Sequence, residues 1–489
     1  MRIVDLRNPP KILMYKASSG EYFRLVSTNI LMKKAFLSLS ILLTFLYGSA
    51  QEQNNIWYFG EQAGLDFSSG TPVAISNSAL SSLEGSAVQL DASGNLLFYT
   101  NGGDFQTFAG GIWNSNHQLM PNGDLAGESG CNSSVQSTVI VPHPGNSNRY
   151  FVFTTDCQEN GLNGGLAVNV VDMSLDGGLG DVVTKDSILY SGQVNENLCA
   201  IRHQNGSDYW IIAHKVGMYD FLIIPVTSSG IGTIVTQTTG WPAYNGTGQM
   251  ATNITGNKFA YAVLNKIMLF DFNNNTGALS NYIQINSDAQ ALCFSANCRY
   301  LYASYVGPPS DSIFQFDLQA PNIEASRTAI AQVNATNFQM QLGPDGKIYM
   351  SRNLSNYLGV INNPDSPAAQ VTYTSNGVSL GSGICRAGLP NLLVSNYGFC
   401  GFNSGKNDVN EQTDHVLEVY PNPTQNEVFL KNFKGTMDLQ IFSITGQLVH
   451  SGRLYTNTFS FSGFKTGMYW LVLKDDSGNI FRQKILVEP

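Results

Sequence analysis

The residues best placed to do chemistry are six acids and amides that recur at similar positions in a repeated pattern. They are Glu84, Gln136, Glu196, Gln249, Gln290 and Gln339, and Arg386 stands just before a further apolar run. Converging amides and carboxylates bind sugar hydroxyls or a cation. The same groups also satisfy one another and water in a polar channel, so a structural role stays open. Glu84 and Glu196 would suit glycoside hydrolysis if the fold placed them about 5 to 10 Å apart.

Other kinds of chemistry leave no pattern in the sequence. It contains no HExxH helix, phosphate-binding loop, nucleophile elbow or dinucleotide fingerprint, and no Cys/His set with zinc-ligand spacing. We therefore predict no cofactor and no metal. The chain has 26 Lys and Arg against 35 Asp and Glu, a formal net charge of −9. This balance disfavours a nucleic-acid partner, which would need clustered basic residues.

The elements that must position these residues come from a repeat. Six segments contain a short apolar run, a turn rich in Gly, Asn and Asp, and a second run rich in aromatic and β-branched residues: 84–101, 136–156, 196–214, 249–265, 290–305 and 339–351. Their starts lie about 51 residues apart on average, enough for a four-stranded antiparallel sheet. One such sheet cannot bury both faces alone, but sheets arranged radially cover one another.

The two ends of this region complement each other. Residues 388–394 supply one more inner strand without a complete sheet, while 56–60 and 64–67 supply strands without an inner partner. We therefore predict an all-β fold in which residues 51–400 form a seven-bladed β-propeller closed by strands from both ends. A series of β-sandwiches with the same turns is the alternative. The low charged fraction of 12% and the 48 glycines agree with a turn-rich β protein.

The N-terminal region has the pattern of a secretory signal peptide. Lys33 and Lys34 precede an apolar run over 35–47, and the small residues 48–50 suit a cleavage site after Ala50. The run is too short to cross a bilayer, so we expect residues 32–50 to be removed and no transmembrane segment to remain. Residues 1–31 are interpreted as an over-extended start.

The seven cysteines all lie in the predicted exported part, where disulfides persist. Cys131 and Cys157 flank a predicted hairpin, and Cys293 and Cys298 bracket four residues in the same way. These are the two candidate disulfides, with small buried thiols as the alternative.

Two of the repeats resemble known propellers. Residues 294–302 (FSANCRYLY) and 342–349 (LGPDGKIY) look like the repeat of YVTN- and WD-type propellers. The pairing of 57–67 (WYFGEQAGLDF) with 95–102 (NLLFYTNG) is similar to a family of exported propellers from Bacteroidetes-type bacteria. This resemblance implies a fold but no reaction.

A second domain follows a hydrophilic linker over 401–414. Seven short alternating runs within residues 415–489 predict a small immunoglobulin-like β-sandwich. The motifs 420–424 (YPNPT), 445–449 (TGQLV) and 465–473 (KTGMYWLVL), with Lys484 near the end, resemble the type A C-terminal sorting domain of the type IX secretion system. The residues that carry the resemblance are Pro421, Asn422, Pro423, Thr445, Gly446, Gly467, Tyr469 and Lys484.

This resemblance implies a route and a partner. The chain would cross the periplasm, meet the type IX secretion machinery and reach the outer-membrane surface or the medium. Whether the sorting domain is then removed or linked to lipopolysaccharide stays open. Our first hypothesis is an exported binding or adhesion protein with a glycan or cell-surface ligand. The alternatives are a secreted polysaccharide hydrolase or lyase acting at the channel mouth and a purely structural role.

Overall fold

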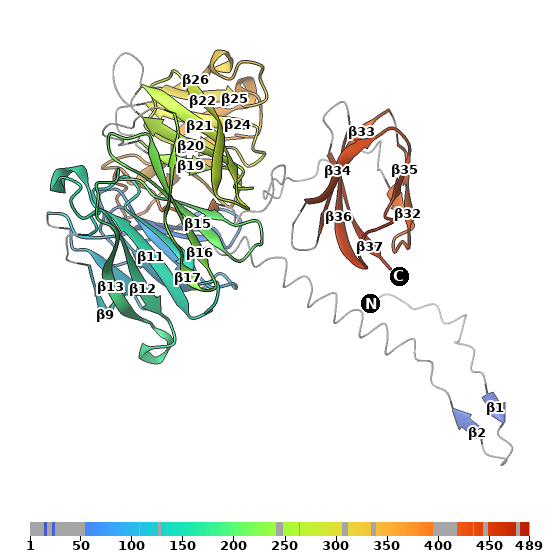
Figure 1. The fold of residues 1–489 in the computed structure, drawn as a ribbon, viewed down its shortest axis with the longest axis horizontal. Coiled ribbons are helices and arrows are strands. Elements are labelled where there is room, and N and C mark those ends of the chain that lie inside the picture. Colours follow the sequence, from blue (N-terminus) through green and yellow to red (C-terminus); the bar gives the residue numbers. More distant parts are fainter. Residues whose placement is uncertain are drawn as a thin grey trace. The chain divides into compact units, whose positions relative to one another are not determined.

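The regular structure of this computed structural model is almost entirely β-strand (Figure 1). The structure describes residues 14–16, 22–24, 54–106, 108–125, 129–240, 248–263, 265–305, 312–333, 339–394, 418–433, 435–443, 448–475 and 480–488. β1 (Met14–Lys16) and β2 (Tyr22–Arg24) pair with each other and form a unit of their own. The predicted signal peptide and linker, 32–50 and 401–414, lie outside the described residues.

Seven antiparallel sheets follow one another along the described part of residues 56–379. The first contains β3 (Ile56–Phe59), β4 (Ala63–Asp66) and β5 (Val73–Ile75). The second contains β6 (Ala87–Leu90), β7 (Leu96–Thr100), β8 (Gly111–Asn114) and β9 (Leu119–Asp124). The third contains β10 (Thr138–Pro142), β11 (Arg149–Thr155), β12 (Leu166–Asp172) and β13 (Asp181–Tyr190).

The other four sheets repeat this order. They contain β14 (Cys199–Arg202), β15 (Tyr209–His214), β16 (Asp220–Thr227), β17 (Gly230–Ile231) and β18 (Val235–Thr238); β19 (Met250–Thr252), β20 (Lys258–Val263), β21 (Lys266–Asn273) and β22 (Ala278–Ile285); β23 (Ala291–Phe294), β24 (Tyr300–Tyr305), β25 (Ser312–Asp317) and β26 (Thr328–Gln332); and β27 (Met340–Leu342), β28 (Ile348–Met350), β29 (Tyr357–Asn362) and β30 (Thr372–Ser379). The described helical elements are single 3-10 turns: η1 (Gln158–Asn160), η2 (Asp176–Gly178), η3 (Glu324–Ser326) and η4 (Ala368–Gln370).

The turns between first and second strands have the predicted residues. Between β6 and β7 the Asp91 carboxylate accepts the N–H groups of Ser93 and Asn95, at 2.8 and 2.9 Å. Gly94 adopts a φ of 81° in this turn, a region that residues with a side chain rarely enter. These local contacts fix the hairpin that begins the second sheet.

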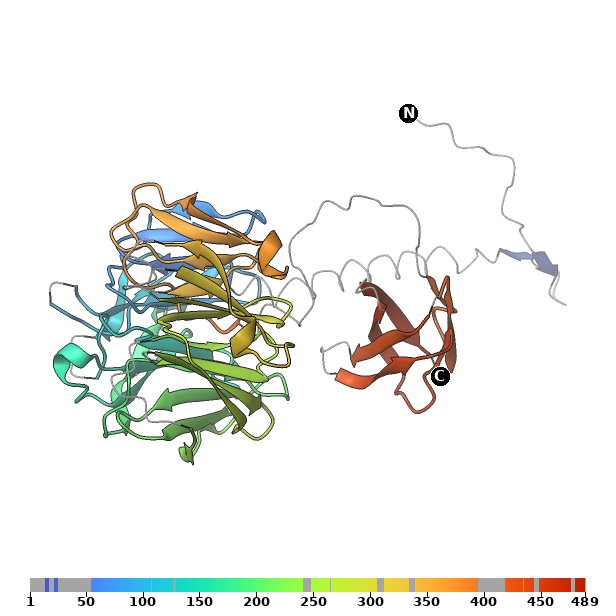
Figure 2. The same ribbon diagram turned by 90° about the horizontal axis from the view of Figure 1, so that it is seen from above.

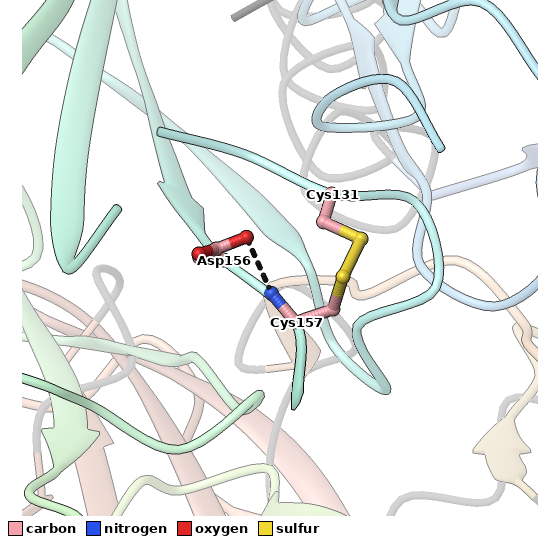
Figure 3. A group of neighbouring side chains, drawn as sticks. All are labelled: Cys131, Asp156 and Cys157. Carbon is pink, nitrogen blue, oxygen red and sulfur yellow. Dashed lines mark hydrogen bonds between the residues drawn. A yellow bond between two sulfur atoms is a disulfide. The ribbon is translucent and has the colours of Figure 1, made fainter. Parts of the chain in front are cut away.

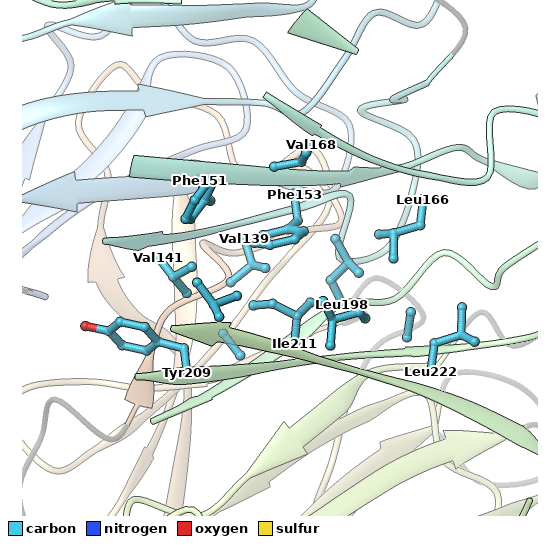
Figure 4. Close-up of a cluster of buried hydrophobic side chains, with 14 of the residues drawn as sticks. Val139, Val141, Phe151, Phe153, Leu166, Val168, Leu198, Tyr209, Ile211 and Leu222 are labelled. Atoms are coloured by element: carbon cyan, nitrogen blue, oxygen red, sulfur yellow. The ribbon is translucent and has the colours of Figure 1, made fainter. Parts of the chain in front are cut away.

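Consecutive sheets share buried cores. Val139 and Phe153 of the third sheet pack with Ile211 and Leu222 of the fourth (Figure 4). The other junctions have equivalent pairs: Phe98 with Val152, Ile212 with Phe259, Leu269 with Leu301, and Tyr302 with Ile348. Each sheet therefore buries both faces against its neighbours, which a single antiparallel sheet cannot do in water.

The first sheet shares cores with both the second and the seventh. Tyr58 packs in one cluster with Tyr99, and Trp57 packs in another with Tyr349 and Leu392. The ring centroids of Trp57 and Tyr349 lie 5.5 Å apart. In Figure 2 the orange strands near residues 360–380 accordingly lie beside the blue strands of the first sheet.

The chain returns to the first and second sheets after β30. Asn391 N–H donates to the Ser86 carbonyl at 2.8 Å, next to a parallel bridge between Ser86 and Pro390. Gly388 lies against Glu84 so closely that a Cβ atom there would come within 1.6 Å of the Glu84 carbonyl oxygen. Within the described residues this segment makes that single bridge rather than the full inner strand predicted from residues 388–394.

The C-terminal part forms two sheets around its own core. β31 (Glu418–Tyr420), β32 (Glu427–Lys431) and β35 (Thr458–Ser460) make one. β34 (Leu448–Leu454), β33 (Met437–Ser443), β36 (Gly467–Asp475) and β37 (Ile480–Val487) make the other. Val428 and Leu430 of the first sheet are buried in one cluster with Ile441, Leu471 and Ile485 of the second. The predicted sandwich arrangement fits these strands.

The two candidate disulfides have different outcomes. Cys131 and Cys157 are bonded, with Cα atoms 5.5 Å apart. The predicted Cys293–Cys298 pair is wrong, because Cys293 is a free buried thiol and Cys298 is bonded to another cysteine. The hairpin register places Cys293 opposite Tyr302, whereas Cys298 lies in the intervening turn with a φ of 59°.

Candidate functional site

The six repeated acids and amides all stand just ahead of the first strand of a sheet. Gln249, Gln290 and Gln339 directly precede β19, β23 and β27. Gln136 lies two residues before β10, and Glu84 and Glu196 lie three residues before β6 and β14. The first strands are neighbours in chain order, so this position recurs at one end of successive strands.

Three of the glutamines form a closed cycle of hydrogen bonds that joins the third, fifth and seventh sheets. Gln136 Nε2 donates to the Met250 carbonyl at 3.0 Å, and its Oε1 accepts the Met250 N–H at 2.7 Å. Gln249 makes the same pair of bonds with Met340, at 2.7 and 3.1 Å.

The cycle closes through Gln339. Its Nε2 donates to the carbonyl of Val135, the residue before Gln136, and its Oε1 accepts the Leu389 N–H at 2.8 Å. The amides of Gln136 and Gln249 therefore act as a peptide group would in a β-ladder, each pairing with the first residue of a first strand two sheets away. Gln339 instead bonds backbone groups that lie outside the named strands. We call Gln136, Gln249 and Gln339 the glutamine cycle.

Three of the amides for which the sequence leaves both a ligand-binding and a structural role open thus belong to the glutamine cycle. All three side chains are at most 5% exposed, and their polar atoms are occupied by backbone groups. Each first strand is an edge strand of its sheet, so the buried backbone groups on its unpaired side need side-chain partners. Two cavities beside these strands measure about 20 and 30 Å³, room for one or two waters each.

Arg386 and Gln290 belong to neither the cycle nor a common ring. Arg386 forms an ion pair with Glu61 and lies over the Phe108 ring, 5.7 Å from its centroid. Gln290 contributes its backbone, with its carbonyl accepting the Gln249 N–H at 2.7 Å.

The two glutamates instead join a third, Glu159, in a cluster that we call the acidic mouth. The Glu84 N–H donates to the Asn132 carbonyl at 2.9 Å. Ser133, which follows Asn132, donates its hydroxyl to the Glu159 carboxylate at 2.9 Å. Glu196 Oε1 accepts the Gln158 N–H at 2.6 Å. The loop after Cys131 thus links the starts of the second, third and fourth sheets.

Burial and mutual repulsion perturb the acidic mouth. The pKa of the Glu84 carboxyl lies well above its usual value, chiefly because the group is buried and secondly because Glu196 and Glu159 are also acidic. Burial also raises the pKa of Glu196 to about 7, although the Gln158 N–H opposes the shift. Glu84 as a whole is half-buried, and no described residue hydrogen-bonds its carboxyl. The acidic mouth can therefore both donate and accept hydrogen bonds near neutral pH.

Asn132 connects the backbones of Glu84 and Phe108. Asn132 Nδ2 donates to the Phe108 carbonyl at 3.1 Å, while the Asn132 carbonyl holds Glu84. Sequence reasoning missed Phe108, Asn132 and Glu159, because none of them recurs in the repeat. The proximity of Glu159 to Cys157 was the one signal available.

Cys131, Asp156 and Cys157 come close enough to suggest a metal site, but their groups are occupied (Figure 3). Both sulfurs are in the disulfide, so neither is a thiolate ligand. The Asp156 carboxylate accepts the Cys157 N–H at 2.8 Å and the Gly164 N–H at 3.0 Å. The group therefore fixes the loop that carries Glu159.

The motif residues of the C-terminal domain mostly serve its fold. Asn422, between Pro421 and Pro423, accepts the Leu486 N–H at 2.9 Å and donates to the Lys484 carbonyl at 2.6 Å. Tyr469 donates its hydroxyl to the Lys465 carbonyl at 2.7 Å, and Gly467 begins β36. Thr445 and Gly446 lie outside the described residues.

The C-terminal motifs belong to a known family. Residues 418–488 match the family model of the secretion system C-terminal sorting domain. The chain therefore carries a type IX sorting domain, which indicates export to the cell surface or secretion, with the secretion machinery as a partner. In the described residues no helix has the length and hydropathy to cross a membrane.

Solved structures similar to the chain include propellers. One is a candidate 6-phosphogluconolactonase of Bacteroides fragilis, with 13% identity, coverage of 69% of this chain and 97% of that one, and a TM-score of 0.47. Another is the β-propeller domain of Cps50 (Swd1) from Myceliophteria thermophila, with 8% identity, coverage of 61% and 94%, and a TM-score of 0.35.

A third is a quinonprotein alcohol dehydrogenase-like protein of Bacteroides thetaiotaomicron, with 10% identity, coverage of 68% and 77%, and a TM-score of 0.38. No curated protein matches the chain. The propeller-like architecture accordingly rests on the chain's own sheets.

Proposed function

We propose that this protein is an exported binding protein of the cell surface or the medium, in which a closed seven-bladed propeller presents a ligand site at the acidic mouth. Two parts of this proposal have separate support: the closure of the propeller and the chemistry of the mouth.

Closure is supported by the shared cores. Trp57 is buried with Tyr349 and Leu392, while Tyr58 is buried with Tyr99, so the first sheet has a neighbour on each face. The Leu389 N–H, accepted by Gln339, ties the returning segment to the glutamine cycle. In such a ring, the segment after β30 takes the inner position beside β3, β4 and β5. The first sheet then becomes a four-stranded blade built from both ends of the propeller region, and the ring has seven blades.

The observation that carries the binding role is the Glu84 carboxyl. Burial raises its pKa, and it has no hydrogen-bond partner among the described residues, on a side chain that is half-buried as a whole. A protonated carboxyl donates one hydrogen bond and accepts others, which matches sugar hydroxyls. We therefore favour a hydroxyl-rich glycan as the ligand.

One observation favours the second candidate, a polysaccharide hydrolase or lyase. Both Glu84 and Glu196 have raised pKa values, as a general acid that must stay protonated requires.

The test is a glycan-array screen of the full exported chain, followed by mass analysis of the bound sugar. We expect an intact glycan and, for Glu84→Ala, binding about tenfold weaker or worse, equivalent to about 1.4 kcal/mol. Glu324→Ala is the matched control, since this exposed carboxylate pairs with Asn286 on another sheet. A cleaved sugar supports the enzyme instead. Unchanged binding by Glu84→Ala places the site elsewhere, and the absence of any bound glycan overturns the ligand class.

A further inference from the structure

The sorting domain carries an exposed aromatic pair that its own fold does not use. Tyr420 of β31 lies directly opposite Phe429 of β32, with ring centroids 6.0 Å apart and ring planes 28° apart. The two residues are 50% and 37% exposed. Their neighbours in β32, Val428 and Leu430, point to the opposite face and are buried in the core. The pair therefore lies on the outer face of its sheet.

Tyr420 begins the motif 420–424 (YPNPT), and Asn422 and Thr424 of that motif have structural roles that Tyr420 does not share. Asn422 holds β37 through Lys484 and Leu486, as described above. Thr424 N–H donates to the Leu486 carbonyl at 2.8 Å, and its hydroxyl donates to the Glu427 carbonyl at 2.7 Å. No described residue hydrogen-bonds the Tyr420 hydroxyl. Tyr420 and Phe429 together form a contiguous aromatic patch, and such a patch on an exposed face marks a site of external contact.

The surroundings of the pair suit a protein partner. Glu427, Lys431 and Ser460 are exposed around it on the same sheet. An aromatic centre with a rim of mixed charge is the usual composition of a protein–protein interface. An anionic lipopolysaccharide would instead need a cluster of Arg and Lys, and Glu427 would repel it.

The edge of this sheet is closed to an added strand. Val419 N–H donates to Gln483 Oε1 at 2.9 Å, and Gln483 Nε2 donates to the Val419 carbonyl at 3.0 Å. A side chain thus occupies the backbone groups through which another strand would pair. Recognition at β31 must therefore use the face of the sheet.

We propose that Tyr420 and Phe429, with the rim of Glu427, Lys431 and Ser460, form the surface by which the sorting domain docks onto a folded protein subunit of the type IX secretion machinery. We call this set the aromatic face. The proposal follows from the domain's role as a sorting signal, which requires recognition by that machinery, and it is independent of what the propeller binds.

The test follows the full chain in a bacterium with a type IX system and measures the exported fraction against the fraction retained in the periplasm. For Tyr420→Ser combined with Phe429→Ser, we expect the exported fraction to fall at least about tenfold. Phe429→Tyr keeps the ring and should be exported like wild type. Tyr455→Ser is the matched control, because Tyr455 is 73% exposed in the same domain and has no aromatic neighbour among the described residues.

Limited proteolysis of the retained chain reports whether the domain is folded. If the double variant is unfolded, Phe429→Lys decides, since it adds a charge at an exposed position and leaves Val428 and Leu430 in the core. Wild-type export of Phe429→Lys or of a folded double variant overturns the proposal, as does an equal loss for Tyr455→Ser. A double variant that changes only the oligomeric state of the purified chain assigns the face to a second copy and also overturns it. Ligand binding by the purified chain stays unchanged if the proposal is right.

Discussion

Replacing Gln249 with alanine removes a side chain that serves three buried backbone groups at once. Its amide accepts the N–H groups of Met340 and Leu292, at 3.1 and 3.2 Å, and donates to the Met340 carbonyl at 2.7 Å. Each buried group left without a partner costs about 1 to 3 kcal/mol. Water entering the neighbouring cavity, which measures about 30 Å³, recovers part of this cost. We expect a net loss of about 3 kcal/mol.

Thermal unfolding of the full chain checks this value. A loss of 1 kcal/mol lowers Tm by about 2 to 4 °C for 150 to 250 residues and by less for a larger body, so we expect a fall of about 3 to 6 °C. Gln290→Ala is the matched control: Gln290 holds the equivalent position before β23, and only its backbone is hydrogen-bonded among the described residues. Its Tm should change by about 1 °C or less.

A third variant separates the hydrogen bonds from the volume of the side chain. Gln249→Glu keeps the shape and the acceptor for Met340 and Leu292 but loses the donor to the Met340 carbonyl and adds a buried acid. It should also be destabilised, and more so as pH rises and the acid ionises. If Gln249→Ala melts within about 1 °C of wild type, the glutamine cycle contributes nothing measurable and our reasoning is refuted.

Two further outcomes follow from the acidic mouth and the disulfide. The pKa of Glu196 is about 7 in the folded chain against 4.5 in the unfolded chain, so between these pH values the folded state holds an extra proton. The free energy of unfolding should therefore fall by up to about 3 kcal/mol as pH rises from 4.5 to 7, and less steeply in Glu196→Gln. A flat or rising profile would contradict the assignment. Removing both Cys131 and Cys157 as alanines opens a loop with a sequence separation of 26 and should cost about 3 kcal/mol, read as a lower Tm that no longer responds to reductant; an unchanged Tm would rule out a stabilising role for the bond.

The repeat positions illustrate how far sequence reasoning reaches. The spacing of Gln136, Gln249 and Gln339 placed them correctly ahead of first strands, because strand alternation and turn residues are local properties. The spacing did not reveal that each amide hydrogen-bonds the backbone of a residue next to another glutamine of the cycle. Gln249 and Met340 are 91 residues apart, and nothing in either segment encodes the other.

The cysteines make the same point with one success and one failure. Cys131 and Cys157 flank a real hairpin region, and their ends meet as the sequence predicts. Cys293 and Cys298 have an equally suggestive spacing, but the register of β23 with β24 places Cys293 opposite Tyr302. A shift in register changes which side chains are neighbours, and sequence spacing alone does not specify it.

The sequence alone determined the all-β character, the turns and the sorting domain. Alternating apolar residues, turn glycines and a short motif such as 420–424 are each read within one segment of the chain. Only the tertiary structure decided which polar side chains are occupied. The glutamine cycle satisfies first strands that are unpaired on one side, and this leaves Glu84 and Glu196 as the polar groups of the mouth. That division depends on distances between sheets far apart in the chain, which hydrophobic packing sets and local pattern does not.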